Sequence, residues 1–209
     1  MPPTPKPPIP EDTYEALMEA TFRALCKRGY SNLRVRDIDP EFEKSRQLIN
    51  HYYDGKDELI LALLKYLLQV YENGIELGDD ADPNRLLERY VHQFLHGPDL
   101  DGFDHWELMK ALEELRSQAQ HQPDHQALLS ETYDHITATL VGIIEDGIDE
   151  GRFRDVDAEL FAHAINGIIN TARTRKICLG QDEAIETAQR ALDAIVLPQL
   201  RREPDAGAG

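Results

Sequence analysis

Apolar residues recur three and four positions apart along nearly the whole chain after residue 10, and this spacing limits the possible folds more than any other feature. It is the period of one face of an α-helix. No stretch shows the sustained alternation of polar and apolar residues that a half-buried β-strand requires. The sequence therefore predicts an all-α protein of about nine helices. It shows no repeat of fixed period that would indicate a solenoid.

Glycine and proline divide the helical pattern into segments. Two short helices are expected at 34–42 and 45–53, followed by a long helix from about residue 56 into the 70s. The last helix is expected at about 182–200. Two prolines, Pro83 and Pro123, are expected to begin helices. Four glycines follow apolar runs and are expected to end them: Gly29, Gly97, Gly151 and Gly180.

Charge is distributed unevenly along the chain. The 209 residues carry 22 Lys and Arg against 39 Asp and Glu, a formal net charge of −17. Residues 1–56 hold nine acidic and nine basic residues, so the whole excess lies in residues 57–209, with thirty acidic and thirteen basic. Such an asymmetry suggests that the two parts face different partners. Arginine outnumbers lysine by fifteen to seven, and with the acid excess this resembles proteins of halophilic microbes. An acidic protein of an ordinary mesophile would also fit.

The N-terminus and the cysteines indicate the cellular setting. Six of the twelve prolines lie in the first ten residues, which predicts an extended, disordered arm at 1–10. No apolar run approaches the roughly 18 residues of a membrane helix, and the N-terminus lacks the apolar stretch of a signal peptide. A soluble, cytoplasmic protein is expected. The two cysteines, Cys26 and Cys178, are too few for a disulfide framework and are expected to be reduced and buried.

One segment carries a specific motif. Residues 29–60, GYSNLRVRDIDPEFEKSRQLINHYYDGKDELI, resemble without gaps the DNA-binding signature of the TetR family of transcriptional regulators (AcrR-like). The resemblance rests on a set of short matches: Gly29-Tyr30, Val35-Arg36-Asp37-Ile38, Ser45, Asn50-His51-Tyr52-Tyr53, Lys56 and Leu59. Residues 147–172 resemble the usual entry into the dimerisation helices of the same family.

This resemblance implies an architecture and a set of partners. It implies a three-helix, helix-turn-helix DNA-binding domain at 11–56 and a helical ligand-binding and dimerisation bundle at 57–203, followed by a disordered tail at 204–209. It also implies a homodimer through helices at about 157–179 and 182–200. The dimer would bind a near-palindromic operator in double-stranded DNA, most often as a repressor in this family, and would respond to a small-molecule effector without a cofactor.

The helix after Ser45 is the expected reading helix. Ser45 is a good N-cap, and a helix N-terminus presents free N–H groups to a phosphate. Its apolar face would pack inward and leave the polar side chains outward: Arg46, Gln47, Asn50 and His51. Arginine can bind guanine bidentately, and Gln or Asn can bind adenine in the same way. The resemblance places phosphate contacts at Lys56 and Arg34.

Three residues depart from the family pattern. Pro40 falls inside the expected helix at 34–42, where it removes a backbone donor and would kink or shorten the helix. The turn that follows has Phe42 and Glu43 where the family commonly has a small residue and glycine. These departures keep an alternative open, in which the chain is a helical interaction or sensor protein of the same fold that has lost DNA binding.

The remaining candidates concern ligands, metals and catalysis. Four residues at helical spacing could line an apolar effector cavity or equally fill the core: Phe94, Trp106, Met109 and Tyr133. His92 and His96 lie four apart and are weak metal candidates that Asp104 and His105 could complete, but no third ligand is fixed by the sequence, so no metal is expected. The chain has no nucleophile elbow, phosphate-binding glycine loop, HExxH motif or paired cysteines, so it is not expected to be an enzyme.

Overall fold

The computed structural model describes residues 9–42, 46–78 and 82–202. Within these ranges the chain forms nine α-helices, three short 3₁₀ turns and one π-helical turn, and no β-strand. The all-α prediction is therefore confirmed. Glu43, Ser45, most of the arm predicted at 1–10 and the tail predicted at 204–209 lie outside the described residues. Among the residues described, no helix is long and apolar enough to cross a membrane.

The chain divides into two compact units. The first unit comprises Met1–Glu72 and Glu107–Leu129, and the second comprises Asn73–Trp106 and Ser130–Gly209. Residues 107–129 thus pack with the N-terminal helices, although the sequence assigns them to the ligand-binding bundle. The functional boundary predicted at residue 56 stays a prediction.

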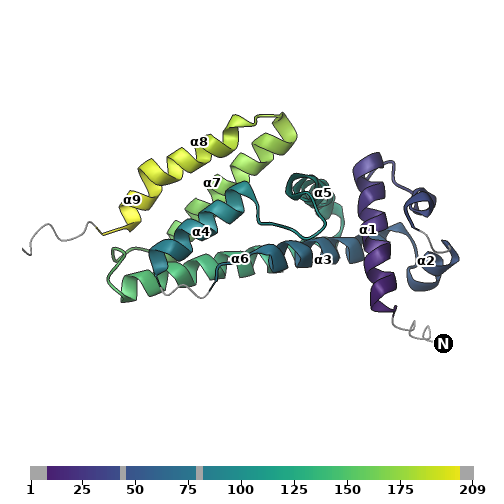
Figure 1. Cartoon of the computed structure of the whole chain (residues 1–209), viewed down its shortest axis with the longest axis horizontal. Helices are drawn as coiled ribbons and strands as arrows, with labels where there is room; N and C mark the ends of the chain where they lie inside the picture. The colour runs from purple at the N-terminus through teal and green to yellow at the C-terminus, as the bar shows by residue number, and fades with distance from the viewer. Residues whose placement is uncertain (1–8, 43–45, 79–81, 203–209) are drawn as a thin grey trace, which may run out of the picture. The chain divides into compact units, whose positions relative to one another are not determined.

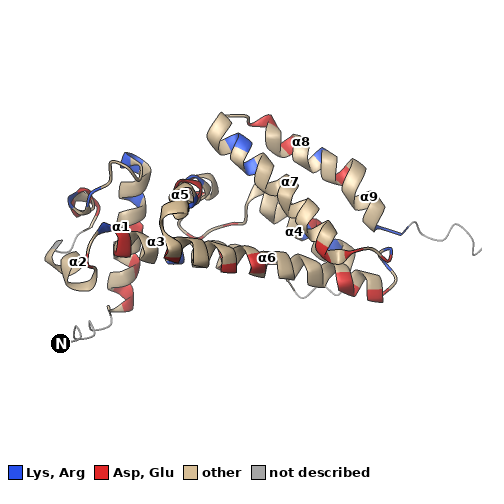
Figure 2. Cartoon of the chain, turned by 180° about the vertical axis from the view of Figure 1, so that it is seen from behind, with Lys and Arg blue, Asp and Glu red and all other residues tan. Residues whose placement is uncertain are grey.

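The N-terminal part of the first unit contains helices α1, α2 and α3 (Figure 1). Helix α1 spans Glu11–Arg28, α2 spans Arg46–Tyr52 and α3 spans Lys56–Gly74. Figure 2 shows acidic residues at the beginning of α1 and basic residues at its end, the arrangement that the helix dipole favours. The core of this first unit includes a set of apolar residues that are each at most 1% exposed: Leu17, Leu25, Ile38, Ile49 and Leu63.

The prediction of a helix at 34–42 is wrong. The structure has two consecutive 3₁₀ turns there, η1 (Val35–Asp37) and η2 (Asp39–Glu41), with Pro40 inside the second. Proline has no N–H, and its ring clashes with the carbonyl of the residue four positions earlier. The chain instead makes bonds three residues apart, such as Glu41 N–H to Ile38 O at 2.9 Å.

In the second unit, helix α4 (Pro83–His96) packs on α7 (Ala158–Leu179) and α8 (Glu183–Ala191). Figure 1 shows α8 running alongside α7. The unit also contains most of α6 (Pro123–Asp149), while α5 (His105–Gln118), the turn η3 (Ala119–His121) and the first residues of α6 belong largely to the first unit.

The single helix expected at 182–200 is interrupted. After α8, the chain makes a π-helical turn, η4 (Leu192–Val196), and then a short helix α9 (Leu197–Leu200) with Pro198 in its first turn. A wider turn before a proline is a known way of accommodating the missing donor and the ring. The burial expected for the cysteines is also wrong, since Cys26 and Cys178 are both free and exposed.

Candidate nucleic-acid interface and effector site

Helix α2 presents a polar face. Ile49 is buried at 1% exposure, whereas Gln47, Asn50 and His51 are exposed. The His51 ring packs edge-on against Tyr52, with 4.9 Å between centroids. Arg46 begins the helix, as predicted. The arrangement leaves amide side chains of α2 accessible over a buried anchor, as base-edge recognition requires.

Some basic side chains that precede α2 in the sequence form ion pairs within the chain, and others are exposed to solvent. Glu41 of η2 binds Lys27 Nζ at 2.6 Å and lies 3.7 Å from Arg23 Nε, so two basic side chains of α1 face a carboxylate. Arg34 and Arg36 are exposed. The Arg34 backbone N–H donates to Asp37 Oδ2 at 2.9 Å, which fixes the start of η1. Arg34 thus stands on a well-defined turn with an accessible side chain.

Lys56, the expected phosphate contact, makes internal contacts. Its Nζ donates to the backbone oxygen of Tyr30 and lies 4.0 Å from the centroid of the Tyr30 ring. Burial lowers the pKa of Lys56, while Asp57 and Glu114 act in the opposite direction. The ammonium is half-buried and held by the turn that follows α1.

The four residues expected to line an effector cavity have separate partners. Phe94 is buried and stacks on Tyr90 at 4.3 Å, and the Arg173 guanidinium lies 5.5 Å from its centroid. Lys176 lies 4.7 Å from the Trp106 centroid. Tyr133 is 39% exposed and stacks on His163. Met109 is buried in the first unit. No pattern in the sequence indicates that Arg173 and Lys176 of α7 cover the rings of Phe94 and Trp106.

A buried polar network joins three helices of the second unit. The Tyr90 hydroxyl donates to Asn166 Oδ1 at 2.7 Å, and Asn166 Nδ2 donates to Thr137 Oγ1 at 3.3 Å. Asn166 is 4% and Thr137 8% exposed. Buried polar groups are expected to be paired in this way, because an unpaired one costs about 1–3 kcal/mol.

The histidines of this unit do not assemble a metal site. The rings of His92 and His96 lie 4.9 Å apart on α4. No three His, Cys, Asp or Glu side chains gather as metal ligands in the described ranges. His105 packs against Gly97, where an added Cβ would lie 2.3 Å from the ring. The pKa of His105 is lowered to about 4, mainly by burial and to a smaller extent by nearby Arg173, while Asp104 acts in the opposite direction.

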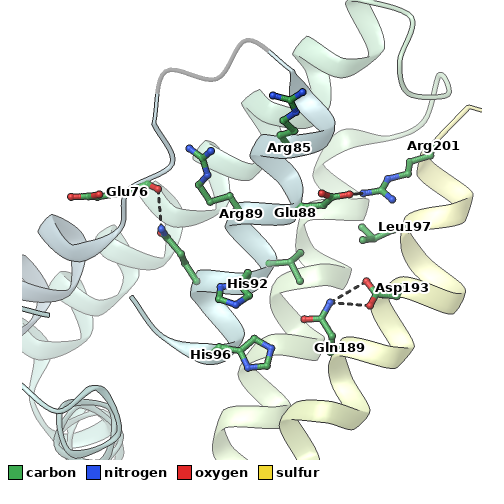
Figure 3. Close-up of a pocket in the computed structure, with 12 residues that line it drawn as sticks. Glu76, Arg85, Glu88, Arg89, His92, His96, Gln189, Asp193, Leu197 and Arg201 are labelled. Atoms are coloured by element: carbon green, nitrogen blue, oxygen red, sulfur yellow. Dashed lines mark hydrogen bonds and ion pairs between the residues drawn. The ribbon is translucent and has the colours of Figure 1, made fainter. Parts of the chain in front are cut away.

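A groove of about 990 Å³ lies between α4 and the α8–α9 segment (Figure 3). Its walls are polar. Arg201 binds Glu88 at 2.8 Å across the groove, and Gln189 donates to both oxygens of Asp193 at 3.0 Å. On the α4 wall Gln93 donates to the Glu76 backbone oxygen at 2.9 Å. Sequence reasoning missed this groove because its walls are about one hundred residues apart in the chain.

The outer face of α7 and α8 is apolar and rich in small residues. A second groove of about 460 Å³ runs along it, and its lining includes Ala164, Gly167, Ile168, Thr187 and Ala191. Leu160, in α7, is 64% exposed, and Ile195, in the turn η4 that follows α8, is 66% exposed. In the same segments Ile165, Ile169 and Leu192 are buried within the chain, whereas Ala172 and Ala188, each at most 6% exposed, lie in the wall of this groove.

Comparisons with known proteins agree with the resemblance in residues 29–60. Residues 83–200 match the family described as "BetI-type transcriptional repressor, C-terminal". The HTH-type transcriptional regulator BetI of Brucella anthropi is 39% identical over 66 residues, which are 32% of this chain and 31% of that protein. The chain therefore spans about a third of the length of the BetI proteins it matches.

Solved structures match over most of the chain. A TetR transcription regulator from Haloarcula marismortui is 34% identical, with a TM-score of 0.83 over 91% of this chain and 99% of that one. A transcriptional regulator from Saccharomonospora viridis in complex with choline has a TM-score of 0.78 and 22% identity over 93% of this chain and 100% of that one, a likeness of fold alone. The matched family and the Haloarcula marismortui protein are transcriptional regulators, which agrees with the expectation that the chain is not an enzyme.

Proposed function

Because the chain belongs to the TetR family of transcriptional regulators, we propose that it represses transcription by binding operator DNA through α2. The observation that carries this proposal is the exposed amide face of α2 above the buried Ile49. Gln47 and Asn50 would bind base edges together with Arg46, and His51 would lie at the margin of the contact. Ser45 and Arg34 would bind phosphates, which position the protein without specifying sequence.

The test uses operator binding by matched variants. We expect the DNA upstream of the chain's own gene to be shifted, and Gln47→Ala and Asn50→Ala each to cost about 1–3 kcal/mol on the preferred sequence. Gln126→Ala, an exposed glutamine on α6, is the control and should change nothing. No binding by the unaltered protein at micromolar concentration would favour the alternative, a protein of this fold that has lost DNA binding.

We place the dimer contact on the outer face of α7 and α8. The small residues along that face allow close approach of helices, and a two-fold mate would cover Leu160 and Ile195. Such a dimer brings two copies of α2 to half-sites about one DNA turn apart or slightly more, which calls for a near-palindromic operator.

Gly167 offers a sharp test of this interface. An added side chain there meets nothing within 4 Å in the single chain, and glutamate is a better helix former than glycine. We expect Gly167→Glu to be a folded monomer by light scattering. Ser130→Glu, on an exposed position of α6, should stay dimeric. A dimeric Gly167→Glu would exclude this face.

A small-molecule effector in the second unit completes the proposal. The groove between α4 and α8–α9 has a volume in the upper range of ligand sites, whereas the ring faces of Phe94 and Trp106 are already covered by Arg173 and Lys176.

Choline, which the Saccharomonospora viridis regulator binds in its complex, is the first probe for calorimetry. Loss of choline binding in Glu88→Gln supports the groove, because the Glu88 carboxylate in its lining can attract the quaternary ammonium, and loss only in Trp106→Leu would overturn it. We expect the protein to act in the cytoplasm together with its proposed DNA partner.

A further inference from the structure

The turn after α1 is held from two sides within the first unit. Lys56, at the first position of α3, donates to the Tyr30 backbone oxygen and covers the Tyr30 ring at 4.0 Å. From the other side, Glu114 Oε1 accepts the Tyr30 N–H at 2.5 Å, and the Gln122 amide donates to the Tyr30 hydroxyl at 3.4 Å. Both polar groups of the Tyr30 backbone and its hydroxyl are therefore engaged by residues distant in sequence.

Gly29 makes this close approach possible. Its φ is +70°, and a Cβ added there would lie 3.1 Å from the Glu114 carboxylate. A side chain at position 29 would be strained and would crowd the carboxylate that binds Tyr30. Glycine at position 29 therefore allows the positive φ of the turn and leaves space for the Glu114 carboxylate to approach the Tyr30 N–H.

The surroundings of Lys56 are unfavourable for a phosphate. Asp57 and Glu114 both act on its ammonium electrostatically, and a DNA phosphate would add a third negative group near the same cation. To reach a phosphate the ammonium would also give up the Tyr30 carbonyl and ring. A charge-assisted hydrogen bond and a cation–π contact would be lost together.

We propose that Lys56 is a positioning residue for the reading helix: it fixes the start of α3 to the turn after α1, and it is not a phosphate contact. The chain leaves α2 at Tyr52 and enters α3 at Lys56, so the anchor at Lys56 sets where the C-terminal end of α2 is held. This inference rests on the proposed DNA binding, in which the angle of α2 decides whether Gln47 and Asn50 reach the bases.

The salt dependence of operator binding separates the two roles. Each phosphate contact contributes about −0.9 to the slope of log K against log salt. We expect Lys56→Gln to lower operator affinity about tenfold at every KCl concentration from about 0.1 to 0.5 M, with the slope of the wild type. Arg34→Gln, which removes an exposed cation just before η1, should reduce the magnitude of this negative slope by about 0.9 per protomer. A fall of that size in Lys56→Gln would overturn the proposal.

A second measurement needs no DNA. In a thermal double-mutant cycle, Lys56→Gln and Tyr30→Leu should be non-additive, because both remove the cation–π contact between Lys56 and the Tyr30 ring. Tyr30→Phe is the matched control, since it keeps the ring and the carbonyl and loses only the bond to Gln122. Lys56→Met replaces Lys56→Gln if that variant is unfolded. Additive effects would refute the contact. A non-additive cycle without operator binding by the wild type would refute the proposed function alone.

Discussion

The Tyr90 hydroxyl is the best place to measure how much the polar network of the second unit stabilises the fold. Tyr90→Phe removes one oxygen from a fully buried side chain and leaves its volume otherwise unchanged. The Asn166 carbonyl oxygen then loses its 2.7 Å donor in a position that is 4% exposed. Leaving a buried acceptor without its donor costs about 1–3 kcal/mol. For a chain of this size each kcal/mol lowers the melting temperature by about 2–4 °C.

We therefore expect Tyr90→Phe to melt about 4–8 °C below the wild type, for a loss of about 2 kcal/mol. Tyr133→Phe is the matched control, because the Tyr133 hydroxyl is exposed and its contact with His163 Nδ1 is 3.4 Å long. It should change the melting temperature by less than about 1 °C. Circular dichroism at 222 nm follows both transitions. Equal melting temperatures for the two variants and the wild type would refute the reasoning.

Three other perturbations test separate features. Gly97→Ala should destabilise the chain by about 2–4 kcal/mol in chemical denaturation, because its φ is +96° and the new Cβ would lie 2.3 Å from the His105 ring; an unchanged midpoint would contradict this packing. His105 has a folded pKa of about 4 against 6.5 unfolded, so the unfolded state binds more protons between these values and stability falls as the pH drops through that window; His105→Gln should lose this part of the pH dependence, and parallel curves would refute it. With a net charge of −17, the melting temperature should rise between about 0.1 and 1 M KCl as screening shortens the Debye length to roughly 3 Å; a flat series would exclude a salt-requiring fold.

Helix ends that depend on local signals were predictable from the sequence. Helix α4 runs from Pro83 to His96, and Gly97 follows it with positive φ, as expected. Helix α7 has Asp157 as its N-cap, with a 2.9 Å bond to the Leu160 N–H. These features need only a few neighbouring residues, because a cap or a stop acts within one helical turn. Both errors of the fold prediction, at 34–42 and at 182–200, occur where a proline falls inside an apolar period.

The candidate site was predictable only in part, because periodicity gives the face of a helix and not its neighbour. The pattern placed Ile49 inward and left Gln47 and Asn50 outward, as the structure has them. It could not indicate that Arg173 and Lys176 cover Phe94 and Trp106, since these contacts join residues 79 and 70 positions apart. The groove on α4 was beyond sequence reasoning for the same reason.

The equal numbers of acidic and basic residues in 1–56 do not show which basic side chains are paired within the chain. In the part of the chain that the structure describes, Lys27 and Arg23 face Glu41, and Lys56 is held by Tyr30. A count of nine basic residues therefore overstates the positive charge available to DNA. Phosphate neutralisation supplies most of the affinity of many DNA-binding proteins. Here the base-edge contacts of α2 and the pairing of two half-sites in a dimer must carry a larger share, which makes the position of α2, and hence the Lys56 anchor, decisive for operator binding.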